Sequence, residues 1–327
     1  MKAVLCKQYG LPDTLVVEEL PALAPAAGQV VVSMKAAGVN FPDALIIQGK
    51  YQMKPPFPFS PGTELAGVVK AVGAGVGNVK PGDAVIAYAG YGAYAEEIAV
   101  DARACIPMPP GVDFKVAASF MMTYGTSYHA LKDRALLRAG ETLLVLGAAG
   151  GVGSAAVELG KLMGARVIAA ASSEDKLAAC RQLGADATID YAKEDLREAV
   201  KRITAGKGVD VVYDPVGDKF AEPAMRDMAW GGRYLVIGFA GGEIPKIPLN
   251  LPLLKGFSIV GVFWGNFTRK EPQKNEANVR ELLGWIASGK LKPLVSAAYP
   301  LEQAARALKD VMERKVKGKV VLVAGQN

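Results

Sequence analysis

The chain has 327 residues, of which 51% are hydrophobic and 21% charged, and its formal net charge is +6. This length and composition exclude a disordered chain and predict a folded protein of about two domains. The densest basic group runs from Arg314 to Lys319 without interleaved aromatic residues, which favours a solvated face over a nucleic-acid site. Because no apolar run reaches bilayer length and the N-terminus lacks a signal-peptide core, we expect a cytoplasmic protein without membrane contact.

The residues that could hold a metal ion are few and scattered. Cys6, Cys105 and Cys180 lie far apart and form no C-x-x-C pair, and His129 is the single histidine. A zinc site needs three or four Cys, His or acidic ligands, so we expect no metal centre, and the cysteines fit a reducing compartment. The chain also lacks a G-x-S-x-G motif and a Cys/His pairing, which removes support for hydrolase chemistry.

Residues 1–122 read mostly as β-structure, with short runs rich in Val and Ile separated by Gly and Pro. This pattern is typical of a barrel-like or sandwich-like domain. The loop at residues 38–43 and the proline-rich residues 54–61 interrupt it and suggest a stiff wall of an active site. Residues 116–131 predict a helix that joins two domains. The expected strands are residues 2–6, 15–20, 30–35, 65–72, 84–87 and 96–100.

From residue 141 onward, strands and helices alternate. Six strands with crossovers long enough for helices predict a doubly wound parallel sheet. The expected strands are residues 142–146, 165–170, 187–189, 209–213, 234–237 and 258–262, and the expected helices are 154–163, 174–183, 196–204 and 220–228. After two further helices, at 278–288 and 301–314, we expect a last strand at 319–323 to return to the first domain. The expected boundaries are therefore 1–122, 123–266 and 267–327.

A glycine-rich turn opens this alternating region. A short apolar strand ends at Gly147, and a helix follows the spacing Gly147-x-x-Gly150-x-x-Gly153. The N-terminus of a helix carries a partial positive charge and unpaired N–H groups, and glycines let a phosphate come close to the backbone. Followed by more than a hundred residues of alternating strands and helices, the turn predicts a dinucleotide-binding loop.

The end of the second strand of this region favours NADPH over NADH. NAD selection normally needs an Asp or Glu there, but the strand ends in alanines followed by Ser172 and Ser173. Both hydroxyls can donate to a 2′-phosphate, and Lys176 follows one helical turn later. The structural alternative for the serines is helix N-capping. Tyr191 is a candidate to pack against the adenine, or else a surface aromatic.

Hydride transfer asks the protein to orient a substrate and to stabilise charge that develops on an oxygen. Asn40, Tyr51 and Tyr128 are candidate donors, and a tyrosine can also supply a proton. Each also has a structural interpretation, which the residues alone favour: a turn residue, a loop anchor and a core residue respectively.

Several motifs stand in the order seen in zinc-free medium-chain dehydrogenases/reductases. They are Gly38-Val39-Asn40-x-x-Asp43, Pro61-Gly62-Thr63-Glu64, Lys80-Pro81-Gly82-Asp83, Ala148-Ala149-Gly150-Gly151-Val152-Gly153 and Asp214-Pro215-Val216-Gly217. Over its whole length the chain most resembles the NADPH:quinone oxidoreductases, the zeta-crystallin-like branch. Zinc-using relatives carry Gly-His-Glu where this chain has Gly62-Thr63-Glu64, in agreement with the missing metal ligands.

The resemblance implies a GroES-like catalytic domain, a Rossmann domain that binds NADPH, and a homodimer joined through the strand from Ser258 to Phe263. It implies that Asn40 and Tyr51 lie near the nicotinamide and the substrate. The other residues that it assigns to the cofactor are Thr126 and Tyr128 on the connecting helix, Gly150, Gly151, Val152 and Gly153 at the pyrophosphate, Ser172, Lys176 and Tyr191 at the adenosine 2′-phosphate, and Phe239 and Arg314 near the nicotinamide half and the phosphates.

Three hypotheses about function follow. The leading one is an NADPH-dependent reductase of quinones or other electron-poor conjugated carbonyls, which are small-molecule substrates. The second is an enoyl-thioester reductase with Tyr51 as the proton donor. The third is a non-catalytic NADPH-binding protein with a nucleic-acid or structural role, which only the basic group from Arg314 to Lys319 supports.

Overall fold

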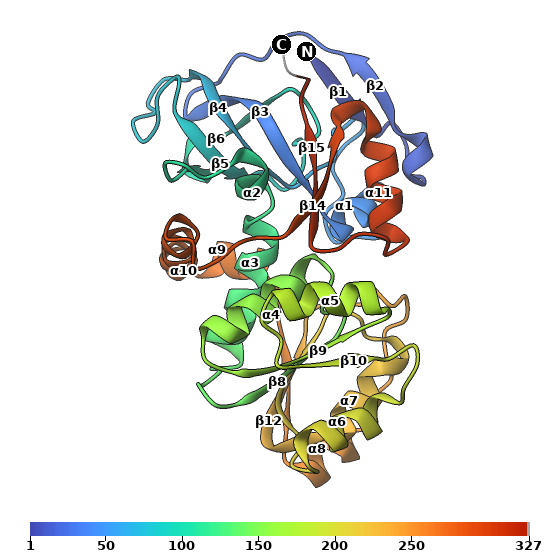
Figure 1. Ribbon diagram of the computed structural model, residues 1–327. Helices are drawn as coiled ribbons and strands as arrows, with labels where there is room; N and C mark the ends of the chain where they lie inside the picture. The colour runs from blue at the N-terminus through green and yellow to red at the C-terminus, as the bar shows by residue number, and fades with distance from the viewer. Residues whose placement is uncertain (326–327) are drawn as a thin grey trace. The chain divides into compact units, whose positions relative to one another are not determined.

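The computed structural model describes residues 1–325, which pack as two compact units (Figure 1). Unit 1 contains Met1–Met122 and the segment that starts at Pro293, and unit 2 is Thr123–Lys292. The first boundary lies where the sequence analysis expects it. The return to unit 1 starts 26 residues later than expected, because helices α9 (Trp264–Lys270) and α10 (Pro272–Ala287) bury their apolar faces in unit 2.

Unit 1 is mostly β-structure. Its strands are β1 (Lys2–Leu5), β2 (Val16–Glu19), β3 (Gln29–Val39), β4 (Glu64–Val72), β5 (Ala84–Tyr88), β6 (Glu97–Asp101), β7 (Cys105–Pro107), β14 (Val295–Pro300) and β15 (Lys319–Val323). Its helices are α1 (Phe41–Ile46), α2 (Phe114–Ala118) and α11 (Ala304–Met312), with short 3-10 turns η1 (Pro12–Thr14), η2 (Ala102–Ala104) and η5 (Leu301–Gln303). Seven strands form one sheet in the order β14-β15-β3-β4-β5-β7, with β6 paired to β3, and β1 and β2 form a separate pair.

The last strand of the chain lies inside the unit 1 sheet. Strand β15 pairs with β3 in antiparallel register, so that Val320 lies opposite Val39 and Val321 opposite Gly38. This confirms that the chain returns to its first domain. Two elements were not expected. Residues 295–300 form β14, although they alternate only between half-buried and exposed, and residues 41–46 form the short helix α1 rather than loop.

Unit 2 is built around a six-stranded parallel sheet. Its strands are β8 (Thr142–Val145), β9 (Arg166–Ala171), β10 (Ala187–Asp190), β11 (Val209–Asp214), β12 (Met228–Val236) and β13 (Ser258–Gly261), in the order β10-β9-β8-β11-β12-β13. Helices α4 (Gly151–Leu162) and α5 (Glu174–Gln182) cover one face, and α6 (Leu196–Thr204), α7 (Ala221–Arg226), preceded by the turn η4 (Asp218–Phe220), and α8 (Asn250–Lys255) cover the other (Figure 1). The expected doubly wound parallel sheet is therefore confirmed.

The strand order of unit 2 shows where a ligand would bind. The connections reverse direction between β8 and β11, and ligands of such sheets bind outside the carboxyl ends of the strands at that point. Strands β8, β9 and β11 are buried nearly throughout, whereas the edge strand β13 is mostly exposed. Within residues 1–325, no helix is both long enough and apolar enough to span a lipid bilayer.

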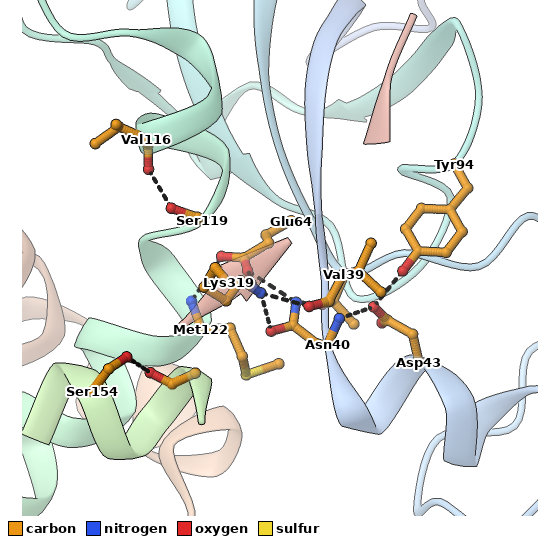
Figure 2. Close-up of polar contacts among 12 residues, drawn as sticks. Val39, Asn40, Asp43, Glu64, Tyr94, Val116, Ser119, Met122, Ser154 and Lys319 are labelled. Atoms are coloured by element: carbon orange, nitrogen blue, oxygen red, sulfur yellow. Dashed lines mark hydrogen bonds and ion pairs between the residues drawn. The ribbon is translucent and has the colours of Figure 1, made fainter. Parts of the chain in front are cut away.

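The segment between the two units is a broken helix. The sequence predicts one helix over residues 116–131, but α2 ends at Ala118 and α3 (Met121–Tyr128) begins after a two-residue break, followed by the π-helical segment η3 (His129–Arg134). At the break, the Ser119 hydroxyl donates to the Val116 carbonyl at 2.8 Å (Figure 2). A serine that bonds to its own backbone in this way competes with the helix ladder, which accounts for the interruption.

Candidate active site

The glycine loop after β8 uses its three glycines differently. Gly147 has a φ of +56°, and a Cβ there would come within 2.8 Å of Val216 Cγ2. A Cβ on Gly153 would lie 2.3 Å from the Gly147 carbonyl oxygen. These two glycines are therefore required by the turn itself. A Cβ on Gly150 would meet only the Gly147 carbonyl oxygen, at 3.3 Å, so the geometry of the turn does not by itself require glycine at this position.

Helix α4 begins at this loop, with Gly150 as its N-cap. The N–H groups of its first turn, which include Gly151 and Val152, have no carbonyl partner inside the helix. The Ser127 hydroxyl donates to the Val152 carbonyl at 2.9 Å and lies 2.8 Å from the Tyr213 hydroxyl, which fixes the start of the helix from α3. Its neighbours Thr126 and Tyr128 are expected at the cofactor from the sequence, whereas Ser127 itself is not.

At the end of β9, two side chains come together as the sequence predicts. Lys176 Nζ lies 3.2 Å from Ser172 Oγ. Because an ammonium only donates, the Ser172 hydroxyl accepts from it, and its own hydrogen points elsewhere. Ser173 has the capping role, since its Oγ accepts the Lys176 backbone N–H at 3.5 Å. Of the two serines, Ser172 is the exposed one.

These residues fit a phosphorylated dinucleotide. Gly150 and Gly151 place no side chain at the start of α4, which suits a pyrophosphate. The hydroxyl and ammonium of Ser172 and Lys176 suit a 2′-phosphate. Tyr191, at the end of β10, packs its ring against Phe220 with centroids 4.4 Å apart, so an aromatic surface also lies in this unit.

The other cofactor candidates of unit 2 differ in how exposed they are. Thr126 is half-buried, and Phe239, in the loop after β12, is 38% exposed. Tyr128 is buried edge-on against Trp285, with ring centroids 5.3 Å apart. Burial, followed by a hydrogen bond to Glu281, raises the pKa of Tyr128. The described surroundings of Tyr128 are those of a core residue.

In unit 1, strand pairing brings three polar side chains to the end of β3 (Figure 2). Glu64 lies opposite Gly38 across the β3–β4 ladder, and β15 places Lys319 on the other flank, next to Asn40. A Cβ on Gly38 would lie 2.5 Å from Glu64 Oε1, so the missing side chain of Gly38 makes room for the carboxylate. Glu64 is fully buried, and Asn40 and Lys319 are each 5% exposed.

A dense set of hydrogen bonds joins these three side chains. Lys319 Nζ donates to the Val39 carbonyl at 2.8 Å, to Asn40 Oδ1 at 2.6 Å and to Glu64 Oε1 at 3.0 Å. Asn40 Nδ2 donates to Glu64 Oε1 at 2.9 Å and to Thr63 Oγ1 at 3.2 Å. Glu64 Oε2 accepts the backbone N–H of Met122 at 2.9 Å. Asn40 is a site residue that the sequence predicts, whereas Glu64 and Lys319 are not.

A second buried carboxylate lies beside this network. Asp43 Oδ2 accepts the Asn40 backbone N–H and the Tyr94 hydroxyl, both at 2.8 Å, while Asp43 Oδ1 is buried without a partner. Burial is the main cause that raises the pKa of Asp43 to about 7, outweighing these two bonds and the nearby charge of Lys319. Asp43 can therefore carry a proton near neutral pH.

Tyr51 and Arg314 complete the predicted residues of unit 1. Tyr51 is half-buried against the apolar core of the unit. Burial, and then the negative charge of Asp43, raise the pKa of Tyr51, which keeps its hydroxyl protonated at neutral pH. Arg314 is exposed and has a left-handed φ of +57° just beyond the end of α11.

The metal-ligating side chains are occupied elsewhere or isolated. His129 Nδ1 lies 2.8 Å from Asp133 Oδ2, and its ring stacks on Phe267 with centroids 3.8 Å apart. The three cysteines are buried thiols without disulfides. Across residues 1–325, no three His, Cys, Asp or Glu side chains are grouped so that they could hold a metal ion.

Two family models match the chain. Residues 26–110 match the alcohol dehydrogenase GroES-like domain, and residues 151–286 match a family described as zinc-binding dehydrogenase. The first range lies within unit 1 and the second within unit 2. The two matches assign the mostly β unit and the parallel-sheet unit to the catalytic and Rossmann domains that the sequence predicts.

Individual relatives extend over nearly the whole chain. Quinone oxidoreductase-like protein 2 homolog of Nematostella vectensis is 40% identical, covering 98% of this chain and 88% of the relative. The crystal structure of Escherichia coli quinone oxidoreductase complexed with NADPH matches with a TM-score of 0.93 and 31% identity, over 99% of this chain and 100% of that one. A structure named NAD-dependent alcohol dehydrogenase matches with a TM-score of 0.89 and 33% identity, over 99% and 100%. The chain therefore belongs to the medium-chain dehydrogenase/reductase family, among the quinone oxidoreductase-like proteins.

Proposed function

We propose that the protein is an NADPH-dependent reductase of quinones or related electron-poor conjugated carbonyls that works without zinc. The observation that carries the choice of cofactor is the pairing of Ser172 Oγ with Lys176 Nζ at the end of β9, where an NAD-selective enzyme places a carboxylate. Relatives named quinone oxidoreductase, one of them solved with NADPH, support the reaction class. The potential metal ligands of the described residues support zinc independence, since the single histidine, His129, is hydrogen-bonded to Asp133.

The residues of unit 2 would hold the cofactor, which supplies a hydride when bound. Gly150, Gly151, Val152 and Gly153 would bind the pyrophosphate through the bare start of α4, which Ser127 fixes in place. Ser172 and Lys176 would bind the 2′-phosphate. The residues proposed to line the rest of the cofactor are Thr126, Tyr128, Tyr191 and Phe239 of unit 2 and Arg314 of unit 1.

The residues of unit 1 would act on the substrate. Tyr51 is protonated at neutral pH and is the proposed catalytic donor of a hydrogen bond or a proton to the substrate. Asn40 is the other proposed active-site residue, and its hydrogen bonds define its contribution more narrowly, as argued in the next section. With no metal to polarise the carbonyl, quinones and conjugated carbonyls are suitable acceptors because they are already electron-poor.

The experiment that tests this proposal measures loss of absorbance by NADPH with quinones, enones and enoyl thioesters, for the wild type and for Tyr51→Phe. We expect the variant to lose enone reduction by about 10²-fold or more, because protonation at carbon needs a placed donor. Quinone reduction should fall less than about tenfold, because water can protonate the oxygens.

The matched control is Tyr91→Phe, which removes an exposed hydroxyl from the same unit and should leave every rate unchanged. A wild type that turns over enoyl thioesters but no quinones would replace the proposal by the enoyl-thioester reductase. Absence of turnover with every acceptor would contradict both and favour a binding protein.

Cofactor preference gives a second prediction. Lys176→Ala should raise the dissociation constant for NADPH by about 10- to 100-fold, because a charge-assisted bond to phosphate contributes about 1.5–3 kcal/mol. The affinity for NADH, which lacks the 2′-phosphate, should stay the same. Fluorescence titration of both nucleotides measures this, with Lys193→Ala as a control on an exposed lysine of the same unit. Equal losses for the two nucleotides would argue against a 2′-phosphate site.

We also propose a homodimer joined through the strand from Ser258 to Phe263. Strand β13 is an open edge of the sheet; Ile259 on it is 41% exposed, and Phe263, two residues beyond its end, is 50% exposed. Trp230, 83% exposed, lies on the neighbouring strand β12, and an exposed edge with large apolar side chains is a template for pairing with a second copy.

The dimer is tested by sedimentation velocity. Ile259→Arg should halve the mass of the particle, because two arginines would face each other across a two-fold interface. Leu11→Arg, at an exposed apolar residue of unit 1, should leave the mass unchanged. A wild type that sediments as a monomer at micromolar concentration would contradict the dimer.

We also propose a cytoplasmic location, with which the three buried free cysteines agree.

A further inference from the structure

The orientation of the Asn40 side-chain amide is dictated by its neighbours. Lys319 can only donate, so it must face the amide oxygen, and it does so at 2.6 Å. Glu64 accepts the Met122 N–H and the Lys319 ammonium, so its Oε1 must face the amide nitrogen, 2.9 Å away. If the oxygen and nitrogen of Asn40 changed places, the amide nitrogen would face the Lys319 ammonium, donor against donor. The amide oxygen would face Glu64 Oε1, acceptor against acceptor.

This orientation determines what Asn40 can still offer to a ligand. A side-chain amide has two N–H donors and two lone pairs on its oxygen. Both donors are used, one by Thr63 Oγ1 and one by Glu64 Oε1. Lys319 uses one lone pair of Oδ1, so any further bond that Asn40 makes without losing one of these must be accepted by that oxygen. Asn40 cannot donate to a substrate oxygen without giving up a bond in a nearly dry site.

We propose that Lys319 and Glu64 are positioning residues that hold Asn40 as a hydrogen-bond acceptor toward the bound nicotinamide nucleotide. The inference rests on the proposed function, because it needs NADPH as the ligand. The carboxamide N–H groups and the ribose hydroxyls of the nucleotide are donors of the kind that a fixed amide oxygen recognises. Donation to the substrate oxygen is then left to Tyr51.

The decisive variant is Lys319→Met combined with Glu64→Gln. It removes both buried charges together, so neither is left unpaired. The new amide at position 64 can accept the Met122 N–H with its oxygen, and its nitrogen then faces Asn40. Asn40 must invert to present its oxygen to that nitrogen, and the Thr63 hydroxyl can reverse its role because it both donates and accepts. The variant should therefore fold and hold Asn40 the wrong way round.

We expect equilibrium titration to show NADPH binding about tenfold weaker in this double variant, the loss of about one hydrogen bond. Its denaturation midpoint should fall less than that of Lys319→Met alone, because only neutral groups such as the Val39 carbonyl lose a partner. The single variant Lys319→Arg, which keeps a donor at this position, should bind NADPH with most of the wild-type affinity. Lys35→Met, on an exposed lysine of strand β3, should leave the NADPH affinity unchanged. Adding Asn40→Ala to the double variant should weaken binding no further than Asn40→Ala alone.

Wild-type affinity in the double variant, or additive losses with Asn40→Ala, would overturn the inference, because Lys319 and Glu64 would then not act through Asn40. That result would leave reductase activity in place. NADPH binding without turnover of any acceptor would instead contradict the proposed function, and the affinity comparison would still hold. A chain that binds no NADPH at all would overturn both.

Discussion

Lys319→Met is expected to lower the free energy of unfolding by about 3–5 kcal/mol, because it leaves a buried carboxylate without its cation. Glu64 has no exposed surface, and its oxygens would keep only the bonds from Asn40 and from the Met122 backbone. The single variant differs in this respect from the double variant with Glu64→Gln, in which no charge is left behind. Urea unfolding of the single variant, the double variant and the wild type measures the difference.

The control for this prediction is again Lys35→Met, which removes an exposed charge from the same sheet and should shift stability by less than about 0.5 kcal/mol. If Lys319→Met unfolds at the same urea concentration as the wild type, the carboxylate must find another partner at little cost. The pair would then contribute nothing to the stability of unit 1.

The contribution of Asp43 to stability should fall as the pH rises from about 4 to about 7, and Asp43→Asn should remove this contribution. Burial raises the pKa of Asp43 to about 7, whereas the unfolded chain loses this proton near its ordinary value of 3.8. Between these values the folded state holds the proton and the unfolded state does not. The stabilisation is therefore complete below about pH 4 and is lost by about pH 7, by up to about 4 kcal/mol.

The structure also explains why Asn can replace Asp43. The amide oxygen can accept from the Asn40 backbone and from the Tyr94 hydroxyl, and its nitrogen would take the place of the oxygen that has no partner. The variant should be more stable than the wild type at about pH 8 and equal to it at about pH 4. Urea unfolding across this range measures the slope, with Asp13→Asn as the exposed control. An unchanged slope in Asp43→Asn would show that another group titrates.

Much of the fold follows from local patterns. The alternation of apolar strands with helices predicted the parallel sheet, and the glycines after the first of these strands predicted the phosphate loop. Ser172 and Lys176 were predictable as a pair because only three residues separate them across the start of α5. The expected return of the last strand followed from simple physics, since an isolated strand must find a partner.

The polar network at the end of β3 could not be predicted in this way. Lys319 belongs to a basic stretch that favours a solvated face, yet it is buried, because the register of β15 against β3 carries it beside Asn40. Glu64 was visible only as part of a motif. Register across three strands that lie far apart in the sequence is a tertiary property, and it decides which side chains meet.

Residues 295–300 and 41–46 were missed for a different reason. Strand β14 has no fully buried residue, so its pattern is weak, and α1 is too short to show helical periodicity. The break at Ser119 was missed because a hydroxyl that bonds to its own backbone looks the same in the sequence as one that points to solvent.

The position of β15 between β14 and β3 also constrains the order in which the protein can form during synthesis. A ribosome releases Thr123–Lys292 as one uninterrupted segment, so unit 2 has its whole core available while the chain is still growing. The first 122 residues of unit 1 are made before unit 2, but they lack strand β15 until unit 2 has been made. More than two hundred residues are synthesised after Glu64 before Lys319, its ion-pair partner, is made. The N-terminal part of unit 1 is therefore the part of the growing chain that needs protection from misfolding.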